Sequence, residues 1–179
     1  MSEIVLIPDF IDEHNCATMM AAFNAAKPMP TDSPFFDDMI IYLQAVEDTC
    51  VRQIMLATRD RILKLLKRRY QVDELYCDSL MLCRWPVGKT MPPHVDNQTT
   101  HHYSTPWRTH SAILYLNNCD SGGELYFTKF NLEIKPRFGL LVAFPSGAYF
   151  EHGVRSLRGG TRYTMPCWFT NDAARRMPS

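Results

Sequence analysis

The sequence lacks long apolar runs and an excess of charge of either sign. Its longest apolar segments, such as 139–145, are far too short to span a bilayer. Lys plus Arg and Asp plus Glu both number 19, so the formal net charge is zero. This balance removes the usual electrostatic argument for binding nucleic acid or an anionic membrane. After Met1-Ser2-Glu3 no basic stretch leads into an apolar one, as it would in a signal peptide, so we predict a cytoplasmic protein.

Several familiar motifs are also missing from the sequence. We find no phosphate-binding loop, no dinucleotide-binding glycine pattern and no Ser/His/Asp signature, which disfavours the enzyme classes that depend on them. No two of the six cysteines are spaced C-x-x-C. Without a secretory context, we expect reduced thiols that pack as small apolar side chains.

The chain is long enough for one domain, and we predict a single domain over 1–179. Apolar residues recur at helical spacing over roughly 13–26, after a capping Asp12, and over roughly 46–69. From about residue 75, short β-rich runs alternate with Gly- and Pro-containing turns. This pattern predicts a helical support region over 1–74 and a core of antiparallel double sheets over 75–171, with the helices packed on one face.

Basic residues are concentrated in the second predicted helix. Such a cluster is usually the solvated face of a helix, although a local basic patch is also compatible with the pattern. Its members are Arg59, Arg61, Lys64, Lys67, Arg68 and Arg69.

Three residues could form a metal site. In an extended chain, His94 and Asp96 point to the same side, because side chains alternate along a strand. His152 follows much later, in a predicted strand over 149–154. Two histidines and one carboxylate on one side of a metal form the facial triad of non-haem Fe(II) oxygenases. A zinc hydrolase could use the same three ligands.

Arg162 lies beyond the turn that follows His152, and we expect the two residues on neighbouring strands. An inward guanidinium needs an anionic partner, because burying it unpaired is costly. That partner could be an internal Asp or Glu, or the carboxylate of a bound small molecule. A zinc hydrolase would have no use for an arginine at this place, so Arg162 favours the oxygenase.

Over 80–171 the sequence resembles the prolyl 4-hydroxylase-like 2-oxoglutarate/Fe(II) oxygenases, including the hypoxia-sensing prolyl hydroxylases. The matching stretches occur in the family's order. They are Leu82-Cys83-Arg84-Trp85-Pro86-Val87-Gly88, His94-Val95-Asp96-Asn97, Ala112-Ile113-Leu114-Tyr115-Leu116-Asn117, Ser121-Gly122-Gly123-Glu124-Leu125-Tyr126-Phe127, 134–144, His152-Gly153-Val154, Gly160-Thr161-Arg162-Tyr163 and Trp168.

The resemblance implies a double-stranded β-helix (jelly-roll) core that is mainly β with flanking α-helices. It implies Fe(II) bound by His94, Asp96 and His152, and dioxygen and 2-oxoglutarate as co-substrates. It implies that Arg162 and Tyr115 hold the distal carboxylate of 2-oxoglutarate, with ascorbate as a candidate reductant. Halogenating relatives lack the carboxylate ligand, so the presence of Asp96 predicts hydroxylation.

The predicted substrate pocket contains aromatic and imidazole side chains: Trp85, His101, His102, Tyr103 and Trp168. Trp85 stands where the hypoxia-sensing relatives carry tyrosine, and Pro166 replaces a polar residue near the co-substrate. These differences leave the prime substrate open. A prolyl residue in a peptide or protein is the first hypothesis, and a free amino acid or other small metabolite is the second. A non-catalytic jelly-roll binding module is the third.

Overall fold

The computed structural model describes residues 3–26, 36–99 and 104–178, and the chain is mainly β. Its first part contains β1 (Val5–Ile7), α1 (Glu13–Ala25), β2 (Ile40–Tyr42), the 3-10 helix η2 (Leu43–Ala45) and α2 (Thr49–Tyr70). The remainder consists of β3 (Tyr76–Trp85), β4 (Met91–His94), β5 (Arg108–Tyr115), β6 (Ser121–Gly122), β7 (Leu125–Phe127), β8 (Leu132–Ile134), β9 (Leu141–Pro145), η3 (Ala148–Phe150), β10 (His152–Val154), β11 (Leu157–Gly159), β12 (Arg162–Thr170) and η4 (Ala173–Arg175).

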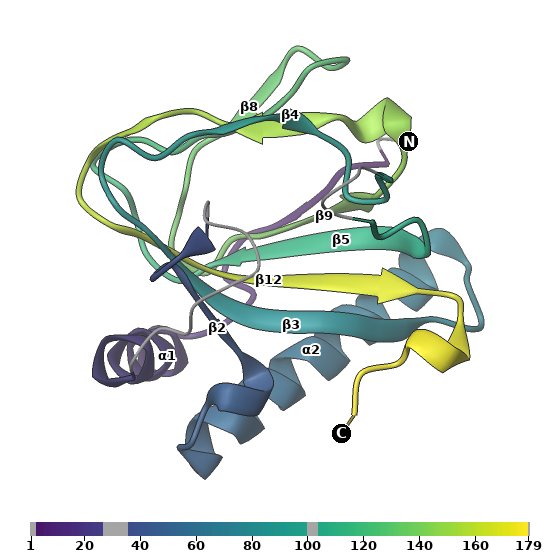
Figure 1. Ribbon diagram of the computed structural model, residues 1–179, viewed down its shortest axis with the longest axis horizontal. Helices are drawn as coiled ribbons and strands as arrows, with labels where there is room; N and C mark the ends of the chain where they lie inside the picture. The colour runs from purple at the N-terminus through teal and green to yellow at the C-terminus, as the bar shows by residue number, and fades with distance from the viewer. Residues whose placement is uncertain (1–2, 27–35, 100–103, 179) are drawn as a thin grey trace.

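The strands form two main sheets that face each other (Figure 1). The larger has six strands in the order β1-β9-β5-β12-β3-β2, and the smaller has four in the order β4-β10-β7-β8. Neighbouring strands are antiparallel in both sheets. The helices lie on the outer side of the larger sheet, as predicted. The region predicted as helical support also contains β1 and β2, which are strands of the larger sheet. The short apolar run that ends before Pro8 indicates β1 from the sequence, whereas β2 was not predicted.

Capping side chains set where the two long helices begin. Asp12 accepts a hydrogen bond from the backbone N–H of Asn15 at 2.9 Å, which confirms the predicted cap of α1. In α2 the Asp48 carboxylate accepts from Cys50 and Val51. The helix therefore begins at Thr49, later than the predicted residue 46, because Asp48 itself is extended. No helix in the described ranges is both long and apolar enough to cross a membrane.

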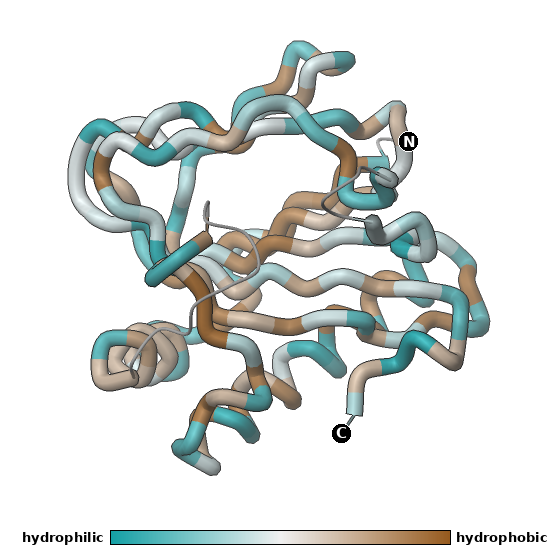
Figure 2. The backbone as a smooth tube through the Cα atoms, viewed as in Figure 1, coloured by the Kyte–Doolittle hydropathy of each residue, from teal (hydrophilic) through white to brown (hydrophobic). Residues whose placement is uncertain are grey.

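The two faces of the six-stranded sheet have different surroundings. Side chains on the outer face, such as Leu82, Leu114 and Met165, pack against α1 and α2 in one apolar cluster. The alternating residues on the inner face, such as Trp85 and Tyr115, belong to a second cluster between the sheets. Figure 2 shows the corresponding apolar stretches along the central strands. The space between the sheets is where the candidate site lies.

Two sequence-based expectations about the strands are wrong. The strand predicted over 149–154 begins only at His152, because Ala148–Phe150 form η3. His152 and Arg162 do not lie on neighbouring strands, since β10 belongs to the four-stranded sheet and β12 to the six-stranded sheet. β11 lies between them in the chain, so the two residues approach the interior from opposite sheets.

Candidate active site

His94, Asp96 and His152 come together between the sheets. Their ligand atoms all lie within 4.8 Å of one another. The Asp96 carboxylate oxygens are 3.7 Å from Nε2 of His94 and 3.7 Å from Nε2 of His152. His152 and His94 are directly opposite each other in the pairing of β10 with β4. The predicted cluster of two imidazoles and one carboxylate is therefore present, and its donor set suits Fe(II).

Backbone carbonyls orient both imidazoles. Nδ1 of His94 lies 3.0 Å from the carbonyl oxygen of Pro92, and Nδ1 of His152 lies 2.9 Å from that of Phe150. A carbonyl oxygen only accepts, so each Nδ1 carries the proton and each Nε2 presents its lone pair to the metal position. Burial lowers the pKa of His152, which keeps this ligand neutral and ready to bind a cation.

Asp96 lies in a turn just after β4, where contacts from other segments hold it. Thr105 Oγ1 donates to its backbone carbonyl at 2.8 Å, and its carboxylate accepts from the Ser111 hydroxyl. Burial raises the pKa of Asp96, but His152, His94, the Ser111 hydrogen bond and Arg108 together outweigh it, and the pKa is lowered. The carboxylate is therefore ionised and available as a ligand.

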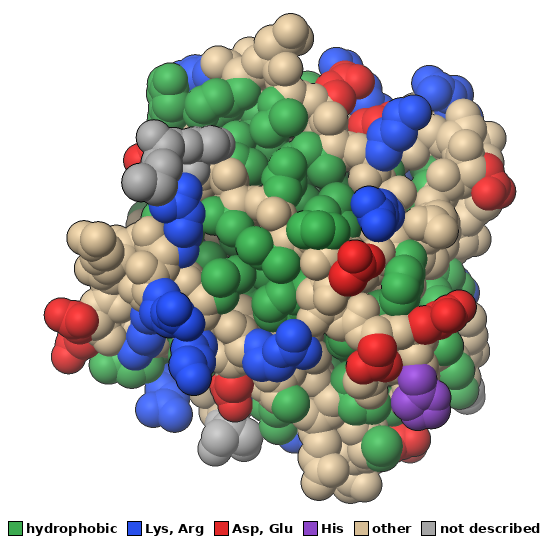
Figure 3. Space-filling model, turned by 180° about the vertical axis from the view of Figure 1, so that it is seen from behind, with side chains coloured by type: hydrophobic (Ala, Val, Ile, Leu, Met, Phe, Trp, Pro, Cys, Tyr) green, Lys and Arg blue, Asp and Glu red, His purple; other side chains and the backbone are tan. Residues whose placement is uncertain are grey.

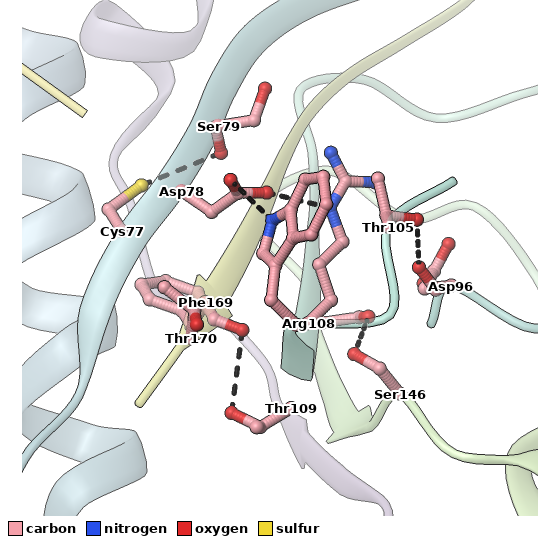
Figure 4. A network of polar contacts seen from close by, with 12 residues as sticks. Cys77, Asp78, Ser79, Asp96, Thr105, Arg108, Thr109, Ser146, Phe169 and Thr170 are labelled. Carbon is pink, nitrogen blue, oxygen red and sulfur yellow. Dashed lines mark hydrogen bonds and ion pairs between the residues drawn. The ribbon is translucent and has the colours of Figure 1, made fainter. Parts of the chain in front are cut away.

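A pair of buried serines stands behind this carboxylate. Ser111 Oγ and Ser146 Oγ lie 2.7 Å apart, and both side chains are almost inaccessible to solvent. With Ser111 donating to Asp96, Ser146 donates to Ser111, and a hydrogen-bonded chain runs from β5 and the loop after β9 to the metal position. Figure 4 shows Ser146 and Thr105 on either side of this region, close to Asp96.

Ser111→Ala is expected to weaken metal binding roughly tenfold, because groups that orient metal ligands typically contribute 10–100-fold in affinity. Titration of the apoprotein with Mn(II) would measure this without depending on turnover. Ser111→Thr keeps the hydroxyl and should retain affinity close to that of the unchanged protein. Equal losses in the two variants would mean that Ser111 acts only through packing.

Arg162 and Tyr115 form the second part of the site. Arg162 is 2% exposed and Tyr115 is fully buried. Arg162 Nη2 donates to the Tyr115 hydroxyl at 3.5 Å, and its guanidinium lies 5.3 Å from the Trp85 ring centroid. Among the described residues no carboxylate pairs with Arg162, and its Nε has no hydrogen-bond partner. The internal salt bridge left open by the sequence is thus not present in the described chain.

This buried guanidinium is suited to an anion that comes from outside the chain. Leaving such a charge unpaired is costly, and a carboxylate can accept two parallel hydrogen bonds from it. Burial raises the pKa of Tyr115, although Arg162 acts against this rise, so the phenol stays protonated and can donate a further hydrogen bond. The distal carboxylate of 2-oxoglutarate has the chemistry that this pair needs.

Gly123 makes room for the guanidinium. Its φ is +75°, and a Cβ added there would lie 3.1 Å from Arg162 Cδ and 3.2 Å from Leu157 Cδ1. Any larger residue would be strained and would press on the arginine stem. Gly123 therefore helps to shape the end of the pocket where Arg162 lies.

Of the five predicted substrate-pocket residues, the structure describes two, Trp85 and Trp168. Trp85 lies beside Arg162, opposite it in the pairing of β12 with β3, so it lines the co-substrate end. Trp168 lies under the guanidinium of Arg108, 4.4 Å from the ring centroid. The remaining residues, His101, His102 and Tyr103, lie outside the described residues. Their assignment to the substrate pocket stays a prediction.

Arg108 is a buried charge that sequence reasoning missed. Its Nε donates to Asp78 at 2.7 Å, and Asp78 also accepts from Trp107 Nε1 at 2.9 Å (Figure 4). Arg108 also lowers the pKa of Asp96. No local motif could have revealed the pair, because β3 supplies Asp78 and β5 supplies Arg108. The ion pair fixes the end of β5 next to the metal position.

Comparison with known proteins identifies the class of protein that this fold and site define. The sequence model of the 2OG-Fe(II) oxygenase superfamily matches residues 80–170, and the chain belongs to this superfamily. Members of the superfamily use Fe(II), 2-oxoglutarate and dioxygen, which agrees with the predicted cofactors. The matched segment begins in β3 and ends with β12, and it contains all five residues of the candidate site.

The curated relatives are prolyl hydroxylases. The chain is 31% identical over 137 residues to prolyl 3-hydroxylase 1 of Homo sapiens, covering 63% of this chain and 19% of that protein. It is 41% identical over 71 residues to prolyl 3-hydroxylase 1 of Gallus gallus, covering 37% and 10% respectively. The chain thus spans about a fifth or less of the length of these relatives.

Solved structures confirm the jelly-roll fold. A viral collagen prolyl hydroxylase from Paramecium Bursaria Chlorella virus-1, in a 2OG complex, matches with a TM-score of 0.75 at 14% identity, covering 94% of this chain and 96% of that one. A prolyl hydroxylase from Trichoplax adhaerens, in complex with a hypoxia inducible factor peptide fragment, matches with a TM-score of 0.74 at 17% identity, covering 97% and 86%. At these identities the likeness concerns the fold.

Proposed function

We propose that this chain is a 2-oxoglutarate-dependent hydroxylase of a prolyl residue in a peptide or protein. The observation that carries the proposal is the pairing of a metal-ligand cluster with a buried arginine that has no carboxylate partner in the described chain. The similarity to prolyl 3-hydroxylase 1 supports the choice of prolyl substrate. The solved relative with a bound peptide fragment supports a substrate that enters as part of a chain.

Different residues of the site would bind the metal and the co-substrate. His94, Asp96 and His152 would hold Fe(II) on one side and leave its remaining positions open. Arg162 and Tyr115 would hold the distal carboxylate of 2-oxoglutarate and so fix the orientation of the co-substrate. The bound metal and co-substrate together supply the chemistry, in which dioxygen converts 2-oxoglutarate to succinate and carbon dioxide and oxidises a C–H bond.

The apolar walls of the site would keep water away from this chemistry. His152 lies among aromatic rings, with the ring centroids of Phe144 at 4.8 Å and Phe127 at 5.8 Å. Such surroundings exclude water and strengthen electrostatic interactions within the site.

We further propose ascorbate as the reductant that maintains Fe(II), and the cytoplasm as the location of the protein.

Assays with prolyl peptides and with free amino acids would test the proposed substrate class. The protein, loaded with Fe(II), is incubated with 2-oxoglutarate and either proline-rich peptides or free amino acids, including L-proline. We expect peptide-dependent succinate formation and addition of one oxygen atom to a prolyl residue, detected by tandem mass spectrometry. Oxygenation of free amino acids alone would replace the proposal with a small-metabolite hydroxylase. Folded, metal-loaded protein that forms no succinate with any of them would favour a binding module.

A further inference from the structure

The basic cluster noted in the sequence lies on α2 and lines a groove at the molecular surface. The groove has a volume of about 580 Å³ and lies between α2 and the loop that carries Phe10. Four cations line it, Arg61, Lys64, Arg68 and Arg69, together with the apolar side chains of Phe10 and Leu65. Figure 3 shows Lys and Arg side chains gathered over α2 on this face. We call this feature the α2 groove.

Ion pairs with carboxylates, which hold four arginines elsewhere in the described chain, are absent at two cations of the α2 groove. In the rest of the described chain, carboxylates pair with Arg59, Arg108, Arg137 and Arg155. Within the described residues no ion pair involves the exposed side chains of Lys64 or Arg68. The chain as a whole is neutral, so this local positive charge is not a consequence of a generally basic composition.

Stabilisation of the helix end explains only part of this cluster. Lys67, Arg68 and Arg69 lie in the last turn of α2, where cations interact favourably with the negative end of the helix dipole. Arg61 and Lys64 precede that turn and have no such role. Arg61 is instead fixed by Phe10: it donates to the Phe10 carbonyl at 2.8 Å, and its guanidinium lies 4.6 Å from the ring centroid. The base of the groove is therefore ordered.

We propose that the α2 groove docks an acidic peptide segment of a partner protein. Charge complementarity selects an acidic ligand, and the half-buried Leu65 provides an apolar contact for an intervening hydrophobic side chain. Arg61 and Arg68 are two turns apart on one side of α2, about 10 Å along its axis. A peptide in the polyproline II conformation presents every third side chain on one side, about 9 Å apart. The groove thus suits acidic residues spaced by three.

The same contacts argue against nucleic acid. Single-stranded nucleic acid is generally held by bases stacked on exposed aromatic faces. The only aromatic ring that lines the groove in the described structure is Phe10, whose side chain is buried and whose face is covered by Arg61. The groove also lies on the outer side of the six-stranded sheet, away from Arg162 and the metal ligands on the inner side (Figure 1). A docked segment would leave the candidate active site accessible.

Fluorescence anisotropy with a labelled peptide would test this proposal. The probe repeats Glu-Leu-Ser four times and contains no proline, so it cannot serve as a prolyl substrate. We expect binding that weakens as ionic strength rises, and at least a tenfold weaker dissociation constant in the double variant Lys64→Glu/Arg68→Glu. The matched control, Lys129→Glu/Lys135→Glu, makes the same change of charge at two exposed lysines that flank β8 and should bind as the unchanged protein does.

Two outcomes would overturn the proposal. One is an equal loss of binding in both double variants, which would show attraction to net charge rather than to the groove. The other is tighter binding of a single-stranded oligonucleotide of the same charge, with displacement of the peptide, which would assign the groove to nucleic acid. Because these measurements need no turnover, they test the groove independently of the proposed hydroxylase activity.

Discussion

Asp96→Ala is expected to abolish hydroxylation and to weaken metal binding by more than about a hundredfold. The substitution removes one of three ligands, and even groups that merely orient such ligands contribute 10–100-fold in affinity. It also removes the only carboxylate of the cluster, which leaves two imidazoles 4.5 Å apart between ring centroids with no anion to balance the cation. Titration with Mn(II) and an assay of succinate formation would measure the two effects separately.

Two further variants make this test specific. Asp73→Ala removes an exposed aspartate in the segment between α2 and β3 and should change neither measurement. Asp96→Asn keeps the shape of the side chain and removes its charge, so a loss of metal binding there would show that the charge matters. Full activity in Asp96→Ala would refute the metal centre. A loss of activity supports it only if thermal unfolding shows that the variant is folded.

The metal ligands could be predicted from the sequence, but the geometry that joins them could not. The argument from alternation along a strand placed His94 and Asp96 side by side, which is correct in outcome. The two residues are not on one strand, however, because β4 ends at His94 and Asp96 lies in the following turn. Thr105 and Ser111 hold that turn, and both come from later in the chain. Such contacts between distant segments leave no local pattern in the sequence.

The fold shows the same division between local and distant information. The periodicity over roughly 46–69 predicted a helix correctly, and its start was misplaced because Asp48 was not recognised as its cap. The division of strands between two sheets depends on pairings such as His152 with His94 and Arg162 with Trp85. Register across distant strands is set by packing in three dimensions. The expectation that His152 and Arg162 lie on neighbouring strands was wrong for this reason.

Arg162→Ala is expected to raise the Michaelis constant for 2-oxoglutarate roughly tenfold to a hundredfold. A hydrogen bond to a charged group contributes about 1.5–3 kcal/mol, and the guanidinium has no other anionic partner in the described chain to compensate. The effect should depend on the distal carboxylate of the co-substrate. The unchanged protein should therefore strongly prefer 2-oxoglutarate over 2-oxobutanoate, which lacks that carboxylate, and Arg162→Ala should lose most of this preference.

The loss of preference separates recognition of the carboxylate from general damage to the pocket. Removing Arg162 also removes packing against Trp85 and Tyr115, whose ring centroids lie 5.3 and 5.0 Å from its guanidinium carbon. Damage of that kind would reduce turnover with both 2-oxo acids in proportion and leave their ratio unchanged. Arg158→Ala, at an exposed position of β11, is the control of the same residue type. It should alter neither the Michaelis constant for 2-oxoglutarate nor the preference for 2-oxoglutarate over 2-oxobutanoate. A preserved ratio in Arg162→Ala would mean that another group holds the distal carboxylate.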